Sequence, residues 1–400
     1  MKKRRNIRRA VILFDAALIM TISVFIIYLY NISVTPPAAA INNDAALIAS
    51  PVTLSSTGLS GQSLTAPQPS IPLPAPAKTS EPPAETPEPK SAVLIFCGDI
   101  LLDGSVRGRI ESTGLDSVIF PEHRGPFIHA DIAMANLENS VSTRGAAMED
   151  KQYTYRADPE FLKLLTDMGI DIVSVANNHT LDFGRDAFAD TLDYLTQYGI
   201  DYVGGGRDKA EAVLWRVLPA GDKTVAFLAA SRVLPVVDWY AGASRSGLFS
   251  TYDPAELNEQ IALACEEADY VAVYVHWGVE RTDMPVQYQK DMAHGYIDAG
   301  ADIVIGSHPH VLQGFEYYNG GLIAYSLGNF IFNDSKKDTA ALEITINPDG
   351  GLTARVLPYE IIYRQVSPIT DGERLEAMRD YLTEISFNAA IGEDYVIYQQ

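Results

Sequence analysis

The stretch "ADIVIGSHPHVLQG", residues 301–314, leads from an apolar run directly into two histidines that stand one residue apart. A short apolar run of this kind is typical of a strand covered on both faces. We expect the chain to stay extended past the run, because Pro309 restricts the residue before it to an extended conformation. Side chains at i and i+2 of an extended segment project to the same side, so His308 and His310 should face one cleft. Neutral imidazole is the commonest side-chain metal ligand, and a pair of satisfied core or edge histidines is the alternative interpretation.

Similar apolar runs recur upstream and alternate with segments of helical periodicity. Strands are predicted at 92–97, 131–136, 171–176, 224–230, 270–276 and 301–306, and helices at 158–169, 185–199, 253–268 and 286–300. After residue 320, apolar and polar residues alternate around turn signals, which is typical of antiparallel strands. The sequence from Ala92 onward therefore predicts an α/β domain with mixed sheets.

Five of the predicted strands end in polar side chains. Apart from His308 and His310, these strand ends carry Asp99, Glu138, Asn177, Asn178, His179 and His276. Ligands of open α/β sheets bind just beyond the carboxyl ends of the strands. Each residue alone could be a helix cap or a turn residue, but caps and turns do not require histidines at three of five ends. Mixed oxygen and nitrogen donors favour Mn, Fe or Zn over Ca or Mg, and the lack of cysteine at these ends excludes a thiolate zinc site.

Six segments resemble, in order and spacing, the motifs of the CapA family, whose members are associated with synthesis of poly-γ-glutamate capsules. They are "FCGDILLDG", "ANLENSVS", "DIVSVANNHTLDFGRDAFADTLDYL", "YVHWGVE", "GADIVIGSHPHVLQGFE" and "YSLGNFIF". The resemblance covers residues 92 to about 335. It implies the calcineurin-like metallophosphoesterase fold, a four-layer α/β/β/α sandwich with a two-metal site between the sheets.

The resemblance also implies roles for individual residues. The ligands of two divalent metal ions (Mn, Fe or Zn) match Asp99, Glu138, Asn178, His276, His308 and His310. His179 matches a histidine that acts on the leaving group or on the transition-state charge, and Asp182 is a candidate to orient it. The wider fold usually has Asp-x-His at the first motif, whereas this chain has Asp99-Ile100-Leu101, so one metal position lacks an imidazole. Asp103 is a candidate for the missing ligand, and a solvated loop carboxylate is the alternative.

The first residues of the chain predict a membrane anchor. Residues 1–9, "MKKRRNIRR", are strongly basic, and residues 10–32 are almost entirely apolar. About 20 apolar residues cross a bilayer as a helix, and basic flanks hold their end in the cytoplasm. A cleaved signal peptide is the alternative, with "PPAAA" at 36–40 as a cleavage region, but the apolar run is longer than a usual signal-peptide core. We therefore expect a single-pass cell-membrane protein with its globular part outside the cell.

The chain after the anchor divides into a linker, a domain and an extension. Residues 33–91 are rich in Pro, Ala, Ser and Thr, which predicts a disordered, semi-extended spacer. Residues 92–365 form the predicted metallophosphoesterase-like domain, and residues 366–400 are expected to pack on it as a C-terminal extension.

Charge and cysteine content limit the partners. The formal net charge is −21 and the basic tail contributes six positive charges, so the rest of the chain carries −27. Such a domain should repel nucleic acid, and it needs metal ions or local arginines to accept an anionic polymer. The two cysteines, Cys97 and Cys265, give no disulfide framework and are predicted to be buried free thiols.

Three functions remain open on this sequence. The leading hypothesis is a membrane-anchored protein that helps to make, export or trim a polymer such as poly-γ-glutamate, by metal-assisted hydrolysis if it is an enzyme. The second is a phosphoesterase acting on an unrelated substrate. The third is a non-catalytic scaffold subunit of a polymer synthase, because related sites can host different reactions.

Overall fold

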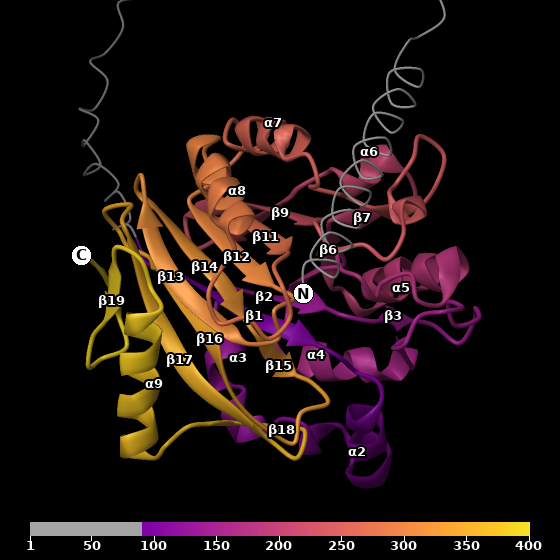
Figure 1. Ribbon diagram of the computed structural model, residues 1–400, viewed down its shortest axis with the longest axis horizontal. Coiled ribbons are helices and arrows are strands. Elements are labelled where there is room, and N and C mark those ends of the chain that lie inside the picture. The colour runs from indigo at the N-terminus through magenta and orange to yellow at the C-terminus, as the bar shows by residue number, and fades with distance from the viewer. Residues whose placement is uncertain (1–89) are drawn as a thin grey trace, which may run out of the picture. The chain divides into compact units, whose positions relative to one another are not determined.

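The computed structural model describes residues 90–400, which contain two large β-sheets (Figure 1). The larger sheet has the order β18 (Gln365–Pro368), β17 (Leu352–Ile362), β16 (Lys336–Ile346), β1 (Ala92–Ile100), β2 (Ile132–Leu137), β5 (Ile172–Ser174) and β6 (Asp201–Val203), with β15 (Asn329–Ile331) also pairing with β1. The smaller sheet has the order β13 (Leu312–Tyr318), β14 (Gly321–Leu327), β12 (Ile303–Ser307), β11 (Tyr270–His276), β9 (Lys223–Ser231) and β8 (Arg216–Ala220).

Both sheets are mixed, as the sequence predicts. β1, β2, β5 and β6 run parallel to one another, and so do β9, β11, β12 and β14. The strands near the chain's end, β16, β17 and β18, join the larger sheet by antiparallel pairing. Each of the six predicted apolar runs contains a strand. The bounds of 270–276 agree with the prediction, and those of the other five runs differ by up to three residues. The parallel strands bring their carboxyl ends to the same edge of each sheet.

Most of the helices lie against the outer faces of the two sheets. The helices are α2 (Ser105–Thr113), α3 (Gly125–His129), α4 (Leu162–Met168), α5 (Gly184–Tyr198), α6 (Lys209–Ala212), α7 (Ala255–Ala264), α8 (Gln287–Asp298) and α9 (Gly372–Glu384). The apolar faces of α4 and α5 pack on the larger sheet, and those of α7 and α8 pack on the smaller one. Figure 1 shows α7 and α8 side by side at the smaller sheet, and α5 beside β6 with α4 next to it.

A continuous apolar core fills the space between the two sheets. The larger sheet contributes Leu94, Phe96 and Met134 to this core, and the smaller sheet contributes Phe227 and Tyr274. These side chains alternate along their strands with those that face the helices, as period-2 patterning requires. The layers are therefore helix, sheet, sheet and helix, and the strand ends of both sheets meet beyond the shared core.

The last residues of the chain continue this architecture. β18 pairs with β17, so the chain after residue 366 starts inside the larger sheet. Helix α9 inserts Met378 and Leu382 into the core between the sheets. Short pairs complete the fold: β3 (Ser140–Val141) with β4 (Arg156–Ala157), β7 (Gly205–Gly206) with β10 (Gly247–Leu248), and β19 (Ala389–Ile391) with β20 (Ile397–Gln399).

The predicted basic tail and membrane anchor, and all but the last two residues of the predicted linker, lie outside the described residues. Between residues 90 and 400, no helix combines the length and the apolar character that a membrane crossing needs.

One of the two cysteine predictions is wrong. Cys97 is buried in β1, whereas Cys265 is exposed. Cys265 follows the last residue of α7, whose buried stripe consists of Leu257, Ile261 and Ala264. The side chain one position beyond Ala264 points away from this stripe, because successive residues on a helix lie about 100° apart.

Candidate metal centre

The ends of five strands, from both sheets, deliver the predicted ligands to one place. Asp99 is the second-to-last residue of β1, Glu138 directly follows β2, and His276 is the last residue of β11. Asn178 and His308 follow β5 and β12. Asp99, Glu138 and His276 are fully buried although all three are polar. Burial of so many polar groups is costly unless something satisfies them.

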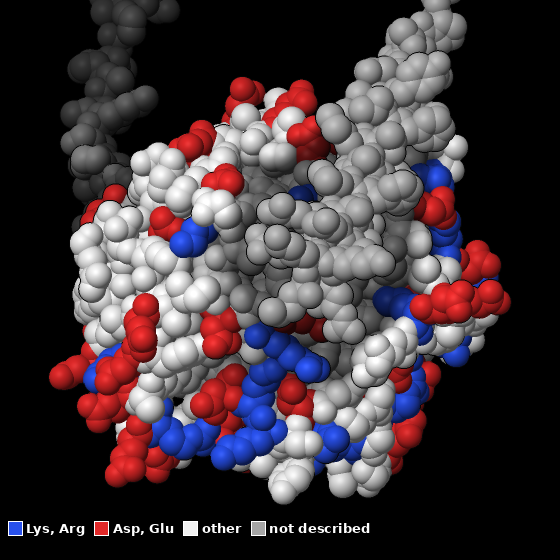
Figure 2. All heavy atoms as spheres, in the orientation of Figure 1, with Lys and Arg blue, Asp and Glu red and all other residues white. Residues whose placement is uncertain are grey.

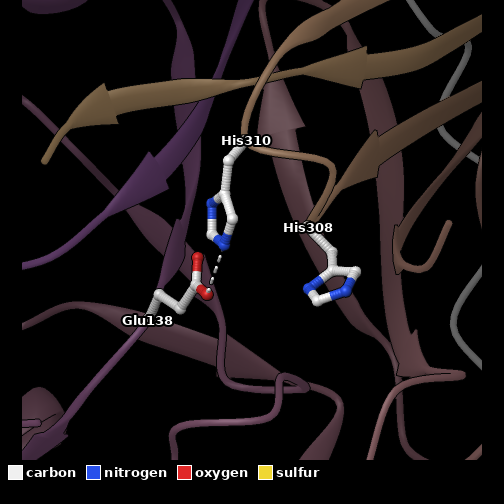
Figure 3. Close-up of side chains that lie close together, drawn as sticks. All are labelled: Glu138, His308 and His310. Carbon is white, nitrogen blue, oxygen red and sulfur yellow. Dashed lines mark ion pairs between the residues drawn. The ribbon is translucent and has the colours of Figure 1, made fainter. Parts of the chain in front are cut away.

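The ligand atoms form two overlapping groups that share Glu138. One group is Glu138, His308 and His310, and the other is Asp99, Glu138 and His276; within each, the candidate ligand atoms all lie within 4.8 Å of one another. Figure 3 shows the first group, with Nε2 of His310 3.9 Å from Oε1 of Glu138. Nε2 of His276 lies 2.8 Å from Oδ1 of Asn178. All six predicted ligands are thus brought together.

Three ligand atoms have no partner within residues 90–400. Both carboxylate oxygens of Glu138 and Nδ1 of His308 are buried and make no hydrogen bond there. Buried polar atoms are nearly always paired, and an unpaired set such as this one points to a missing ion or water. Carboxylate, amide and imidazole donors suit divalent Mn, Fe or Zn. The residues present therefore fit a divalent metal centre.

Burial is the main cause of the shifted pKa values in the site. Burial, and next the charge of Asp99, raise the pKa of Glu138 well above its usual value. Burial lowers the pKa of His308 to about 3, and burial with the neighbouring imidazoles lowers that of His276 well below its usual value. Both rings are therefore neutral at pH 7, which is the state that binds metal. A cation between the carboxylates would remove the repulsion that keeps a proton on Glu138.

Polar neighbours make hydrogen-bond contacts with atoms of three candidate ligands. Oγ of Ser307 lies 2.9 Å from Nδ1 of His276, and Oδ1 of Asn329 lies 2.7 Å from Nδ1 of His310. Nδ2 of Asn136 donates to Oδ1 of Asp99 at 2.8 Å. Such outer hydrogen bonds fix the ring tautomer and orientation of metal ligands. The sequence analysis did not single out these three neighbours, although each lies inside a quoted motif.

His308 and His310 approach each other on a bent backbone and not on the predicted extended one. β12 ends at Ser307, and His308 and His310 have φ angles of 92° and 57° instead of the extended conformation predicted from Pro309. The chain therefore bends at both residues, and the imidazole centroids lie 5.6 Å apart. The preference of a residue before proline is outweighed here by contacts with the other sheet, because the backbone N–H of His308 donates to Oδ2 of Asp99 at 3.3 Å. Strained backbone of this kind persists where the surroundings hold it, often at functional sites.

A second polar group adjoins the ligands. Nδ1 of His179 lies 2.6 Å from Oδ2 of the buried Asp182, as expected for a histidine that an aspartate orients. Oδ2 also accepts a hydrogen bond from the backbone N–H of Tyr155, whose ring packs on His179 at 4.7 Å. Burial lowers the pKa of His179, against the opposing effect of Asp182. The arrangement fixes one nitrogen of the ring and leaves Nε2 for chemistry.

Lys151 is a further residue of this group that the sequence analysis missed. Its Nζ forms an ion pair with Asp182 and a hydrogen bond with the carbonyl oxygen of Asn178. Lys151 comes from the irregular segment between β3 and β4, where no periodic pattern marks its position. Charged residues flank Lys151 in the sequence, with Glu149 and Asp150 before it and Arg156 after it, so no local signal distinguishes it.

Other candidates lie outside the centre. Asp103 accepts hydrogen bonds from Nε of Arg107 and the backbone N–H of Arg156, so it does not replace the missing ligand and is not a solvated loop carboxylate. Trp277, which directly follows the ligand His276, is buried and packs between Tyr296 and Tyr325.

Two facing sheets with buried oxygen and nitrogen ligands between their strand ends define an α/β protein with a candidate metal centre. The sequence model of the family described as "Bacterial capsule synthesis protein PGA_cap" matches residues 93–334, which include every candidate ligand. The chain belongs to this family.

Two relatives with CapA in their names agree with this assignment. The chain is 31% identical over 286 residues to the PGA biosynthesis protein CapA of Bacillus subtilis (strain 168), covering 68% of this chain and 73% of the relative. It is 30% identical over 321 residues to the capsule biosynthesis protein CapA of Bacillus anthracis, covering 73% and 76%. A hypothetical protein of Thermus thermophilus of known structure aligns with a TM-score of 0.42 at 19% identity, covering 67% of this chain and 98% of that one.

Proposed function

We propose that this protein is a metal-dependent hydrolase that cuts an anionic polymer of the poly-γ-glutamate type during capsule synthesis, export or trimming. The proposal rests on the position of Glu138. This residue belongs to both candidate ligand groups, and both of its carboxylate oxygens are buried without a hydrogen-bond partner in the described residues. The polymer is suggested by the Bacillus subtilis relative, whose name assigns it to PGA biosynthesis. The metallophosphoesterase-like resemblance of the motifs supports a hydrolytic reaction.

Different residues would have different roles in amide hydrolysis: some would bind metal ions and others would transfer or stabilise a proton. Glu138, His308 and His310 would hold one ion. Asp99, Glu138 and His276, with Asn178 beside His276, would hold a second. Divalent ions bound there would activate a water and polarise the attacked carbonyl. His179 would give a proton from Nε2 to the departing amine nitrogen, because an amine leaves poorly as an anion. Asp182 would stabilise the positive charge on the ring, and the ion pair with Lys151 would hold Asp182 in place.

The departure from the usual first motif limits this chemistry. The position two residues after Asp99, where the wider fold has an imidazole, holds the fully buried Leu101. One ion would therefore have fewer protein ligands than in ordinary phosphoesterases. This feature is the reason to test a non-catalytic scaffold and a phosphoesterase against the proposed hydrolase.

One assay separates these functions. The purified full-length chain, loaded with Mn²⁺, is incubated with poly-γ-glutamate and separately with a generic phosphodiester. Shortening of the polymer, lost in His179→Gln at unchanged metal content, supports the proposal. Cleavage of the ester alone identifies a phosphoesterase, and bound metal without either reaction identifies a scaffold.

We further propose that residues 10–32 anchor the protein in the cell membrane, with residues 33–91 as a spacer and the domain outside the cell beside polymer-synthase subunits. The basic residues 1–9 support this orientation. The protein should fractionate with membranes, and protease added to intact cells should release a folded fragment that begins near Ala92. Mature protein in the medium that starts near Ile41 would instead identify a cleaved signal peptide.

A further inference from the structure

A cavity of about 330 Å³ opens at the carboxyl end of β9, the strand next to β11 in the smaller sheet. Its lining consists of Arg232, Val233, Leu234, Tyr252, Gly278 and Tyr288. Arg232 directly follows β9, so a sixth strand end carries a polar residue at the same edge of the sheet. The proposed hydrolytic mechanism does not use this cavity.

The guanidinium of Arg232 is held by two tyrosines. Its Cζ lies 4.5 Å from the ring centroid of Tyr252 and 4.7 Å from that of Tyr288, and its Nη1 donates to the carbonyl oxygen of Tyr252 at 3.2 Å. Tyr288 is itself fixed, because its hydroxyl accepts from the N–H of Gly278 and donates to the carbonyl oxygen of the same residue. Contact with two aromatic rings pre-organises the planar fork of an arginine and leaves its remaining N–H groups for an anion.

No carboxylate within residues 90–400 forms an ion pair with Arg232, and none lines the cavity. Cationic side chains at two other cavities are balanced: Lys209 pairs with Glu256, and Arg374 pairs with Asp338 and Glu360. The overall charge of the chain is −21, so a cavity whose arginine has no local counter-charge stands out on this molecule. Figure 2 shows acidic side chains interspersed with the basic ones on one face. A pre-oriented guanidinium without a carboxylate partner is suited to a carboxylate or phosphate group.

The cavity adjoins the metal centre through the backbone. Ser231 pairs with His276, and the N–H of Arg232 donates to the carbonyl oxygen of His276 at 2.9 Å. Gly278 lies two residues after His276 and packs closely, since a Cβ added to it would lie 3.0 Å from side-chain atoms of Pro309 and Gln289. The cavity wall and the segment that carries His308 are therefore in contact.

We propose that Arg232 binds a carboxylate of the polymer and so positions the bond next to it at the metal centre. This inference rests on the proposed function. A γ-linked glutamyl chain keeps one free α-carboxylate on every residue, so a carboxylate is available near any bond that reaches the ligands. Arg232 supplies the local positive charge that a domain of strongly negative charge needs in order to hold a polyanion.

The test measures binding of poly-γ-glutamate, and of the same polymer with its α-carboxylates methylated, to the Mn²⁺-loaded full-length protein. Arg232→Gln removes the charge, and Arg232→Lys keeps it without the planar fork. Arg216→Gln is the matched control, because Arg216 lies on the same sheet with its Cζ 5.6 Å from the Tyr202 ring. Thermal unfolding and metal content are recorded for each variant.

We expect Arg232→Gln to weaken binding of the charged polymer about tenfold or more, with unchanged metal content and a smaller salt dependence. Arg216→Gln should change the affinity less than about twofold. Equal affinity of the wild-type protein for charged and methylated polymer would overturn the inference, and so would a loss of binding that Arg216→Gln reproduces. If Arg232→Gln does not fold, the polymer comparison and Arg232→Lys decide the matter.

Failure of the proposed function gives a different result. If the wild-type protein binds no polymer, the same variants are titrated with glutarate as a small dicarboxylate. Arg232-dependent binding of glutarate would keep the carboxylate site while refuting the polymer. Absence of both would refute the site as well.

Discussion

Replacing Glu138 by Gln should change the stability of the protein in opposite directions with and without metal. Glu138 contributes to both ligand groups, so its loss removes a ligand from two ions at once. An ion present at 100 times its dissociation constant stabilises the folded state by about 2.7 kcal/mol. A domain of about 310 residues has an unfolding entropy near 0.65 kcal/mol per degree, so one ion should raise Tm by about 4 °C and two by about 8 °C.

In the absence of metal the same substitution should be stabilising. The Glu138 carboxylate is fully buried and neither oxygen has a hydrogen-bond partner within the described residues, so its charged form is destabilising. The Glu138→Gln variant has no charge to bury or to neutralise by proton uptake, so it should be more stable by about 2 kcal/mol, which corresponds to about 3 °C. The folded-state pKa of Glu138 is raised, so the wild-type protein loses stability as pH rises through that pKa. The advantage of the variant should therefore grow with pH.

The assay is thermal unfolding with excess Mn²⁺ and with a chelator, at several pH values. Glu316→Gln is the matched control, because Glu316 is also buried but accepts from the Tyr325 hydroxyl at 2.6 Å and pairs with His294. This control should lose stability and keep the full response to metal. A wild-type response to Mn²⁺ in Glu138→Gln, or a lower Tm of that variant in chelator, would refute the reasoning.

Three further outcomes follow from the site. His308→Ala should lose at least half of the bound metal in elemental analysis while His294→Ala keeps it, and equal loss in both would contradict ligation by His308. Metal affinity should fall as pH falls, by about tenfold per pH unit for each competing proton. The fall should begin above the usual histidine range, because Asp99 raises the pKa of His310 despite the opposing effect of burial. Mn²⁺ titrations between pH 6 and 8 that give one constant affinity would contradict this. Asp182→Asn should lower kcat of the proposed hydrolysis about 100-fold or more at normal metal content, whereas a parallel loss of metal would make Asp182 part of the centre.

The sequence predicts those parts of the fold and site that depend on local patterns. Apolar runs mark the strands, because strands covered on both faces need few polar residues. Parallel strands present their carboxyl ends at one edge, so the sequence alone places Asp99, Glu138 and His276 together. Spacing within a motif also predicts the contact between His179 and Asp182, three residues apart.

Other features depend on contacts between distant segments and leave no periodic pattern. The positive φ angles of His308 and His310 accompany contacts with the opposite sheet, and the rule for residues before proline describes only neighbours. Lys151 lies in an irregular segment and Arg232 directly follows a strand, so neither belongs to a periodic pattern. Only their contacts in the folded protein, with Asp182 and with Tyr252, distinguish them. The exposure of Cys265 depends on which side of α7 packs on the smaller sheet.

The distribution of the ligands along the chain has a consequence for folding kinetics. Asp99 and His308 are 209 residues apart in sequence and come from different sheets. An unfolded chain therefore offers no short segment that binds a metal ion strongly, and the centre forms only after both sheets have packed together. A bound ion would then act as a clamp between the sheets, made late in folding and broken early in unfolding. We expect chelation to speed unfolding while leaving the folding rate nearly unchanged.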